Sequence, residues 1–265
     1  MIHIDGDLCV YAVASACEGK RYRYKGVVYD SKLELNKILK ADGVNDSSVE
    51  FFTEPESWES CRTSAISYLE GILEKFDDET KVYLSGKSNF RYALATIKPY
   101  KGNRALEKPV HFDAVRQFYV DYYGATVSVG MEADDLIGIN HDPDTDVIAT
   151  RDKDLDCVPG LHYDWTKDTC RYIQEYDADI HFYSQVLTGD STDNVLGLYG
   201  VSKDSKLLKS LKELKTTKEI FNFVRDQYES RFGSYWKLFM KETCELVWIR
   251  QRREEIWRSY FGTYN

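Results

Sequence analysis

The stretch from Gly130 to Asp193 constrains this chain most, because it concentrates acidic residues where apolar runs end. Its segments read GMEADDLIG, IATRDKDLD and LTGDSTDN, and their acids are Glu132, Asp134, Asp135, Asp152, Asp154, Asp156, Asp190 and Asp193. Converging carboxylates repel one another and would destabilise the fold that brings them together. The usual remedy is a divalent cation, and hard oxygen ligands suit Mg²⁺ or Mn²⁺.

The spacing of these acids favours convergence. Asp152 and Asp154 are two residues apart, so both side chains leave the same side of an extended chain. Asp190 and Asp193 are three apart, which makes them neighbours on a helical turn. Taken singly, each segment is more often a solvated face or a helix N-terminal cap. Taken together at the ends of apolar runs, they indicate a metal site of the kind that α/β folds build at strand ends.

Composition narrows the class of protein. At 265 residues the chain forms one large domain or a core with a small appendage. The net charge of −9 argues against indiscriminate binding of polyanions but allows a local basic patch. No apolar run is long enough to span a membrane. The six scattered cysteines form no CxxC pair, so we expect reduced thiols and a cytoplasmic location, in the host cell if the protein is viral.

Strand-like and helix-like stretches alternate up to residue 188, which predicts parallel βαβ units. Strands are expected at 2–4, 80–84, 125–129 and 146–149, helices at 8–17, 31–41, 57–76 and 177–188, and hairpins at 21–29 and 161–173. From Gly189 onward the strand signals stop. The aromatic residues of the helical tail are expected to pack rather than to bind a ligand.

Residues 86–108 differ in character from the rest. They carry one acid against six cations, Lys87, Arg91, Lys98, Lys101, Arg104 and Lys108, with Phe90, Tyr92 and Tyr100 interleaved. Such a segment is typical of a mobile element that follows a phosphate backbone and stacks on bases. The alternative is a solvated loop whose aromatic side chains enter the core. That alternative suits Phe90 and Tyr92 better than it suits the segment from Tyr100 to Arg104.

Read in order, these motifs resemble those of the 5′-nuclease superfamily, the flap endonucleases and phage 5′→3′ exonucleases. The order is DG after the first strand, YKGNR in the basic segment, EADD, T-x-D-x-D and GDxxDN, and it extends to about residue 210. The resemblance implies an α/β fold with a mostly parallel central sheet flanked by helices, a PIN-like core. It also implies a nuclease core at 1–188 with a basic helical arch at 86–108. A helical, duplex-binding region at 189–265 would contain a helix–three-turn–helix element.

The resemblance further implies the residues of the site. Two Mg²⁺ or Mn²⁺ ions would be bound, directly or through water, by Asp5, Glu132, Asp134, Asp135, Asp152, Asp154, Asp190 and Asp193. Catalytic roles would fall to Asp5, Asp134, Asp152, Lys101 and Arg104. DNA contacts would come from Tyr100, Lys101, Arg104, Arg91, Lys87, Gly197, Gly200, Ser202 and Lys203, with a potassium ion in the duplex-binding element.

The implied activity is metal-dependent hydrolysis of DNA phosphodiesters, which leaves 5′-phosphate products. The expected partner is DNA with a free 5′ end, a flap or a gap, the expected state is a monomer, and the implied process is replication. The sequence does not decide whether the protein prefers to act as an exonuclease or as a flap endonuclease. It also leaves open whether RNA–DNA hybrids are cleaved.

Two positions depart from the family pattern. The family usually has an aspartate after the strand that precedes the arch, and this chain has Ser85 there, so one ligand is expected to be missing. The duplex-binding signature GxxGIGxKTA reads GLYGVSKDS here, with Ser202 in place of a glycine, which weakens the expectation of potassium binding.

Two other readings compete with the nuclease. A haloacid-dehalogenase-type phosphatase would use Asp5-Gly6-Asp7 and GDSTD, but it leaves EADD, DKD and YKGNR unexplained. A structure-specific DNA-binding protein with a catalytically weak metal site gains weight from the serine at position 85.

Overall fold

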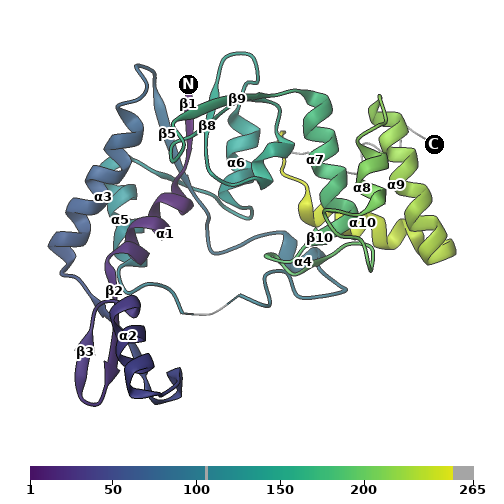
Figure 1. Ribbon diagram of the computed structural model, residues 1–265. Coiled ribbons are helices and arrows are strands. Elements are labelled where there is room, and N and C mark those ends of the chain that lie inside the picture. The colour runs from purple at the N-terminus through teal and green to yellow at the C-terminus, as the bar shows by residue number, and fades with distance from the viewer. Residues whose placement is uncertain (105–106, 253–265) are drawn as a thin grey trace. The chain divides into compact units, whose positions relative to one another are not determined.

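The computed structural model describes residues 1–104 and 107–252 (Figure 1). The described chain divides into two compact units. The first holds residues 1–8, 76–104 and 124–252, and the second holds residues 9–75 and 107–123. The candidate site lies entirely within the first unit. Among the described residues, no helix is both long enough and apolar enough to cross a membrane.

A six-stranded sheet forms the centre of the first unit, and its strands follow the order β6-β5-β1-β7-β8-β9. Their bounds are β1 Ile2–Asp5, β5 Thr80–Leu84, β6 Thr126–Val127, β7 Val147–Ala149, β8 Gly160–Asp164 and β9 Thr169–Ile173. All neighbouring pairs are parallel except β8 and β9, which form the expected hairpin. The predicted α/β class with a mostly parallel central sheet is confirmed.

The register of this sheet brings the carboxyl ends of its parallel strands to one edge. Ile2 and Ile4 of β1 are buried and drive the strand into the centre, between β5 and β7. Asp5 pairs with Tyr83, the next-to-last residue of β5, and Ile4 pairs with Ala149, the last residue of β7. Polar side chains that follow β1, β5 and β7 therefore meet at the same edge.

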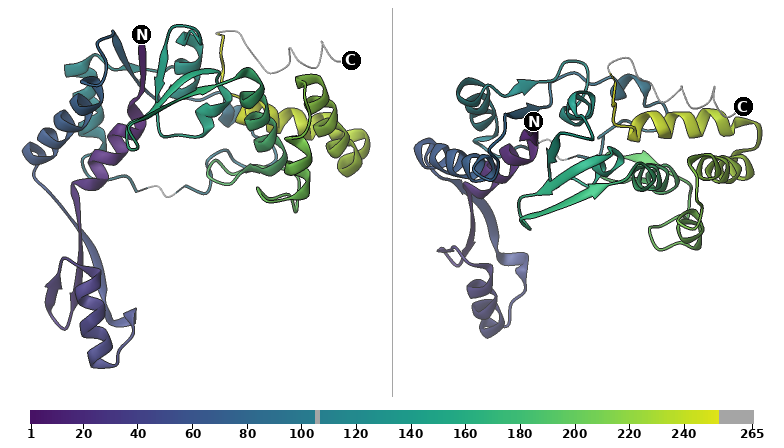
Figure 2. Two further views of the ribbon diagram at one scale, coloured as in Figure 1. Left: turned by 45° about the horizontal axis from the view of Figure 1, so that its top comes forward. Right: turned by 90° about the horizontal axis from the view of Figure 1, so that it is seen from above.

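Helices flank this sheet and continue beyond it (Figure 2). Their bounds are α4 Arg91–Leu94, α6 Ala133–Asn140, α7 Glu175–Thr188, α8 Lys206–Leu211, α9 Thr217–Phe232 and α10 Trp236–Val247, with 3₁₀ turns at Asp154–Cys157 and Gly233–Tyr235. Strands do not stop at Gly189 as predicted, because β10 Gly189–Asp190 and β11 Val195–Leu196 form a short antiparallel pair. In the described part of the expected helical arch, only the single turn α4 is helical.

One hydrophobic core joins the sheet to the helices that follow residue 188. Ile148 of β7, Ile137 of α6, Phe182 of α7, Leu211 of α8 and Trp248 after α10 all belong to it. The helices beyond residue 188 thus fold onto the sheet and not as a separate body. The functional division at 188/189 stays a prediction. Of the tail aromatics, Trp257, Tyr260 and Phe261 lie outside the described residues.

The second unit contains an antiparallel three-stranded sheet and helices. Its elements are the rest of α1 Gly6–Ala16, β2 Glu18–Tyr24, β3 Val27–Tyr29, α2 Lys32–Asp42, the 3₁₀ turn Asp46–Ser48, β4 Glu50–Pro55, α3 Trp58–Leu73 and α5 Phe112–Tyr123. The predicted hairpin at 21–29 is confirmed. Strand β4, which pairs with β2, was not predicted from the sequence. Its side chains are mostly exposed, so it carries little hydrophobic signal.

Candidate metal centre

Acidic side chains from four elements line one small pocket at the carboxyl edge of the sheet. Glu132 immediately precedes α6 and Asp134 lies in its first turn, Asp154 begins the 3₁₀ turn after β7, and Asp190 ends β10. Asp193, in the turn between β10 and β11, completes the acidic lining. Most of the acids predicted from spacing are therefore brought together by chain segments far apart in sequence.

Asp5, Asp134 and Asp152 form the part of the centre nearest to β1. Asp5 accepts hydrogen bonds from the Leu8 amide at 3.2 Å and from the Thr150 hydroxyl at 3.0 Å. Burial, followed by the charges of Asp7 and Asp152, raises the pKa of Asp5 to about 7. Burial, followed by the charges of Asp5, Asp152 and Glu132, raises the pKa of Asp134 well above its usual value. These carboxyl groups repel one another, and the charge of Lys101 offsets this repulsion only in part at Asp134.

Asp154 lies on the side of the pocket that faces β10. Its carboxylate accepts a 2.6 Å hydrogen bond from the Gln185 side-chain amide of α7. Burial, then the charges of Asp152, Asp190 and Asp193, raises its pKa to about 7. Asp152 accepts a hydrogen bond from the Asp154 amide at 2.9 Å, so the two acids of the D-x-D segment are held in one tight turn.

The segment from Tyr100 to Arg104 is bonded directly to these acids. The Tyr100 hydroxyl donates to Glu132 at 2.9 Å and also contacts Asp193. Lys101 pairs with Glu132 and lies 3.6 Å from Asp193, while Arg104 pairs with Asp193. Burial alone would lower the pKa of Lys101, but the charges of Glu132 and Asp193 raise it.

Backbone contacts fix this segment to the turn between β10 and β11. The Lys101 amide donates to the Asp193 carbonyl at 2.8 Å, and the Asn194 side chain donates to the Pro99 carbonyl at 2.9 Å. Lys101 itself has a φ of 56°, a left-handed conformation that is uncommon for a non-glycine residue. The YKGNR and GDSTDN motifs are thus in contact although about 90 residues separate them.

The donor set fits divalent cations that prefer oxygen ligands. It consists of carboxylates, and the raised pKa values of Asp5, Asp134 and Asp154 record negative charge that added positive charge would relieve. Within residues 1–104 and 107–252, these acids do not form a trio of ligand atoms that lie within 4.8 Å of one another. Lys101 and Arg104 already neutralise Glu132 and Asp193, so binding of cations there requires these ion pairs to open.

Asp135 belongs to a buried ion pair with Arg91, whose guanidinium also lies 3.6 Å from the Glu132 carboxylate. Both oxygens of Asp135 accept hydrogen bonds from the Arg91 guanidinium, at 2.6 and 2.8 Å, and one also accepts from the Arg250 amide at 3.1 Å. Its carboxylate also receives the Glu132 amide at 3.1 Å, which closes the first turn of α6. The sequence indicates a metal ligand here, but these oxygens are already engaged inside the protein.

Arg91 is buried rather than presented to solvent, with only 2% of its surface exposed. Besides Asp135 it donates to the Leu246 carbonyl at 2.9 Å and to the Trp248 carbonyl at 2.5 Å. The basic character of residues 86–108 suggests a DNA contact at this position. With its guanidinium bonded to internal groups, we no longer assign Arg91 to the DNA surface.

Asp7 is a candidate functional residue that the sequence reasoning on the nuclease overlooked. Its carboxylate accepts a 2.9 Å hydrogen bond from the Ser85 amide, and its charge acts on Asp5. An acid therefore lies next to the position where the family pattern has an aspartate and this chain has serine. The Ser85 hydroxyl in turn accepts a hydrogen bond from the Ala133 amide at 2.9 Å, at the start of α6. The sequence feature that could have identified Asp7 is the Asp-Gly-Asp motif at the end of β1, which places a second acid two residues after Asp5.

The remaining predicted residues lie outside the pocket. Lys87 is exposed, and Ser202 and Lys203 are exposed in the turns before α8. Gly197 passes so close to Gly189 that a Cβ on it would lie 2.2 Å from the Gly189 nitrogen, and Gly200 has a φ of 80°. Asp156, in the same segment as Asp152, pairs with Arg171. Whether residues 197–203 bind DNA or potassium stays a prediction.

Comparisons with known proteins give likenesses of structure only. No protein-family model matches the chain, and no curated protein matches it by sequence. The structure is similar to that of the bacteriophage T5 flap endonuclease in a pseudo-enzyme–product complex with DNA and metal ions, with 16% identity, a TM-score of 0.44, and coverage of 70% of this chain and 90% of that one.

Further solved structures of the T5 protein are also similar. One was co-crystallised with metal ions (14% identity, TM-score 0.46, covering 92% of this chain and 98% of that one). The other is a mutant of the T5 5′-exonuclease (13% identity, TM-score 0.42, covering 93% and 98%).

Proposed function

We propose that this chain is a divalent-metal-dependent 5′ nuclease that hydrolyses DNA phosphodiesters and leaves 5′-phosphate products. The observation that carries the proposal is the contact between the basic segment Tyr100–Arg104 and the carboxylates at the edge of the sheet. A phosphodiester needs both groups at one place: acids to hold cations, and cations to engage the phosphate.

The acids divide into two groups in this proposal. Asp5, Asp134 and Asp152 would hold one Mg²⁺ or Mn²⁺, and Asp154, Asp190 and Asp193 the other, with Glu132 between them. When bound, such ions supply an activated water and neutralise charge on the leaving oxygen. Burial and then the charges of neighbouring acids raise the pKa values of Asp5 and Asp154 to about 7, which supports the binding of cations beside both carboxyl groups. Asp7 would add an outer-sphere carboxylate beside Asp5.

Lys101 and Arg104 would exchange partners during binding. In the absence of substrate they neutralise Glu132 and Asp193. When cations take over that task, both side chains become available to the scissile phosphate, and Tyr100 can support or stack on a base. This exchange avoids leaving either the acids or the cations unpaired.

The substrate would be DNA with a free 5′ end, a flap or a gap, including RNA primers in hybrids, as in replication. Lys87 and the turns at 197–203 would add phosphate contacts beyond the pocket, and a potassium ion could be held there. The protein would act as a monomer in the cytoplasm. Asp135 and Arg91 are proposed as positioning residues, because their polar groups bond to each other and to the backbone.

Cleavage of a 5′-flap duplex by Asp152→Asn and by Asp156→Asn tests the proposal. The two changes are chemically the same and lie in one short segment, but Asp156 pairs with Arg171 outside the pocket. We expect Asp152→Asn to reduce Mg²⁺-dependent turnover by at least about 100-fold while DNA binding persists, and Asp156→Asn to retain cleavage.

Substrates labelled at either end, with Mg²⁺ or with EDTA, would also show whether the enzyme steps from the 5′ end or cuts at the junction. If wild-type protein bound the junction but cleaved nothing with Mg²⁺ or Mn²⁺, the chain would be a DNA-binding protein and the proposal would fail. Equal turnover in Asp152→Asn and wild type would overturn the assignment of the site.

A further inference from the structure

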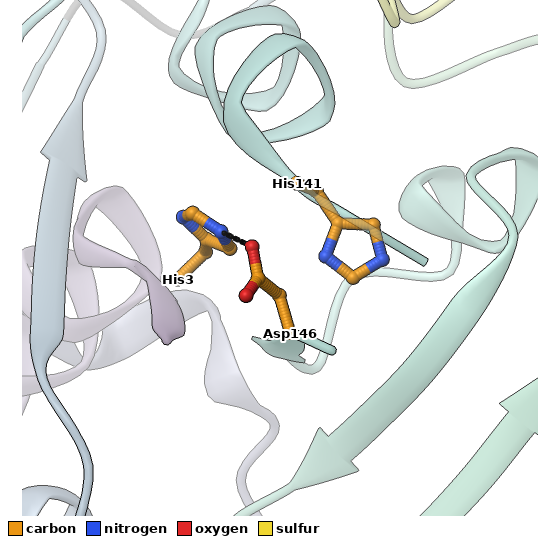
Figure 3. A group of neighbouring side chains, drawn as sticks. All are labelled: His3, His141 and Asp146. Carbon is orange, nitrogen blue, oxygen red and sulfur yellow. Dashed lines mark hydrogen bonds and ion pairs between the residues drawn. The ribbon is translucent and has the colours of Figure 1, made fainter. Parts of the chain in front are cut away.

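A second group of potential metal ligands lies outside the acidic pocket. His3 of β1, His141 at the C-terminal end of α6 and Asp146 just before β7 place one ligand atom each within 4.8 Å of one another (Figure 3). The His3 Nε2 atom is 3.0 Å from Asp146, and the two imidazole rings meet edge to face with centroids 5.8 Å apart. His3 is fully buried, and the side chain of Asp146 is 12% exposed.

Hydrogen bonds fix the protonation of His141. Its Nε2 atom lies 3.0 Å from the Pro159 carbonyl, which can only accept, so Nε2 carries the proton. In the neutral ring Nδ1 is then an unprotonated acceptor. That Nδ1 atom is buried and has no hydrogen-bond partner among the described residues. Burial lowers the pKa of His141 to about 4, so the ring stays neutral at physiological pH. In Figure 3 this nitrogen faces His3 and Asp146.

An unsatisfied buried acceptor is costly unless something fills the space before it. Asp146 cannot donate a hydrogen bond to the Nδ1 atom of His141, because its carboxylate only accepts. It already accepts hydrogen bonds from His3, the Asp142 amide, the Thr145 hydroxyl and the N-terminal ammonium. A metal ion would satisfy the lone pair of His141 and would attract the carboxylate of Asp146. It would displace the ammonium and the Nε2 proton of His3, which can move to Nδ1.

The surroundings of the two rings match the outer sphere of a metal site. Metal-bound histidines usually place their second ring nitrogen against a carbonyl, carboxylate or other acceptor, which fixes the tautomer. His141 has the Pro159 carbonyl in that place, and His3 has the Tyr83 hydroxyl 3.0 Å from Nδ1. Two imidazoles and one carboxylate suit Zn²⁺ and its neighbours in the transition series rather than Mg²⁺.

We propose that His3, His141 and Asp146 form a transition-metal site selective for Zn²⁺ over Mg²⁺, with water in the fourth position. Each of its ligands lies on or beside β1, α6 or β7. At the other end Asp5 ends β1, Asp134 lies in the first turn of α6, and Asp152 follows β7 by three residues. Helix α6 alone spans about 12 Å between the two places. The ion would therefore tie together, at the amino ends of the strands, the elements that position the acids.

Co²⁺ titration of untagged, chelator-stripped protein in millimolar Mg²⁺ tests the proposal, because Co²⁺ with few ligands absorbs strongly in the visible range whereas octahedral oxygen sites do not. We expect one equivalent to bind with visible bands and to be displaced by Zn²⁺. His141→Gln should lower the Co²⁺ affinity by at least about 100-fold, more than loss of an outer-sphere partner usually does. His111→Gln, the same change in the second unit, should leave it unaltered.

Two further measurements keep the proposal testable if His141→Gln folds poorly. Ring ¹⁵N resonances of wild-type protein should show Zn²⁺ shifting two histidines and leaving His111 unmoved. Asp152→Asn should retain the Co²⁺ bands, because the acidic pocket is a different site. Absence of visible bands in wild type, or bands lost with Asp152→Asn but kept with His141→Gln, would overturn the inference. Neither result depends on nuclease activity, so the proposed function is judged separately.

Discussion

At the scale of single residues, Lys101 connects the two chemical groups of the candidate site. Its ammonium pairs with Glu132 and approaches Asp193, and its backbone amide donates to the Asp193 carbonyl. The same side chain therefore competes with cations in the free protein and would engage the phosphate in the complex. Removal of the Lys101 side chain is therefore expected to strengthen metal binding and to weaken catalysis.

Lys101→Met should bind Mg²⁺ more tightly than wild type, because Glu132 loses one of its internal counter-charges and keeps only the more distant Arg91. The same change should lower kcat for flap cleavage by about 10²–10³-fold, the usual loss for one group that stabilises transition-state charge. Calorimetry of Mg²⁺ binding and single-turnover cleavage would measure both quantities. Lys98→Met, at an exposed lysine of the same segment, is the control and should change neither by much. Weaker Mg²⁺ binding in Lys101→Met would contradict the proposed exchange.

At the scale of elements, α6 is the piece on which the site is built. Acids precede and fill its first turn, and His141 caps its other end. Its start is held by the Ser85 hydroxyl and by Asp135, which in turn fixes Arg91 of α4. The Arg91 guanidinium also reaches the backbone that follows α10. Helices from three parts of the chain are thereby fastened at one buried ion pair.

Arg91→Met should destabilise the protein by about 3–5 kcal/mol, because it leaves the carboxylate of Asp135 buried without its partner. Urea unfolding followed by circular dichroism would measure the loss. Arg225→Met removes a surface arginine that pairs with Asp226, and it should cost less than about 1 kcal/mol. If Arg91→Met kept its stability and lost DNA affinity instead, the arginine would be a DNA contact, as the composition of residues 86–108 first indicates.

At the scale of the whole molecule, the crowded carboxyl groups make stability depend on pH. The pKa values of Asp5 and Asp154 are raised to about 7, and that of Asp134 is raised as well. Below about pH 4 these groups are protonated in both the folded and the unfolded state. Between about pH 4 and 7 these carboxyl groups hold more protons in the folded state, so their contribution to the free energy of unfolding falls as pH rises. Burial lowers the pKa of His3, His141, His162 and His181, and these groups contribute in the opposite direction.

Thermal unfolding in EDTA of wild type and Asp154→Asn separates the two contributions, because the histidines are the same in both proteins. Asp154→Asn carries no ionisable group at this position, so its Tm should rise relative to that of wild type between pH 5.5 and pH 8, by roughly 4–8 °C. Mg²⁺ should raise the Tm more at pH 8, where the acids are ionised and available. Asp146 does not interfere, because hydrogen bonds hold its pKa below its usual range despite burial, and its effect falls at lower pH. A Tm difference between Asp154→Asn and wild type that is the same at pH 5.5 and at pH 8 would show that Asp154 is not crowded in the folded protein.

The sequence by itself determined the class of fold and the edge at which the acids gather. Apolar runs such as Ile2–Ile4 and Val147–Ala149 must be buried, and their alternation with helices makes the strands parallel. Parallel strands share a carboxyl edge, so the acids after β1 and β7 could be placed near each other without a structure. These features can be predicted from short stretches of sequence. A run of apolar residues shows that a strand is buried, and the order of the residues gives the direction of the strand.

Only the tertiary structure decided which charges pair. Arg91 and Asp135 are 44 residues apart, and Arg91 and the Trp248 carbonyl are 157 apart, so no local pattern distinguishes a buried arginine from a basic surface residue. The same holds for Asp7 beside Ser85 and for His3 near His141 and Asp146. An ion pair depends on which side chains the packing of distant elements leaves within reach, and that packing is settled by the whole core rather than by any one segment.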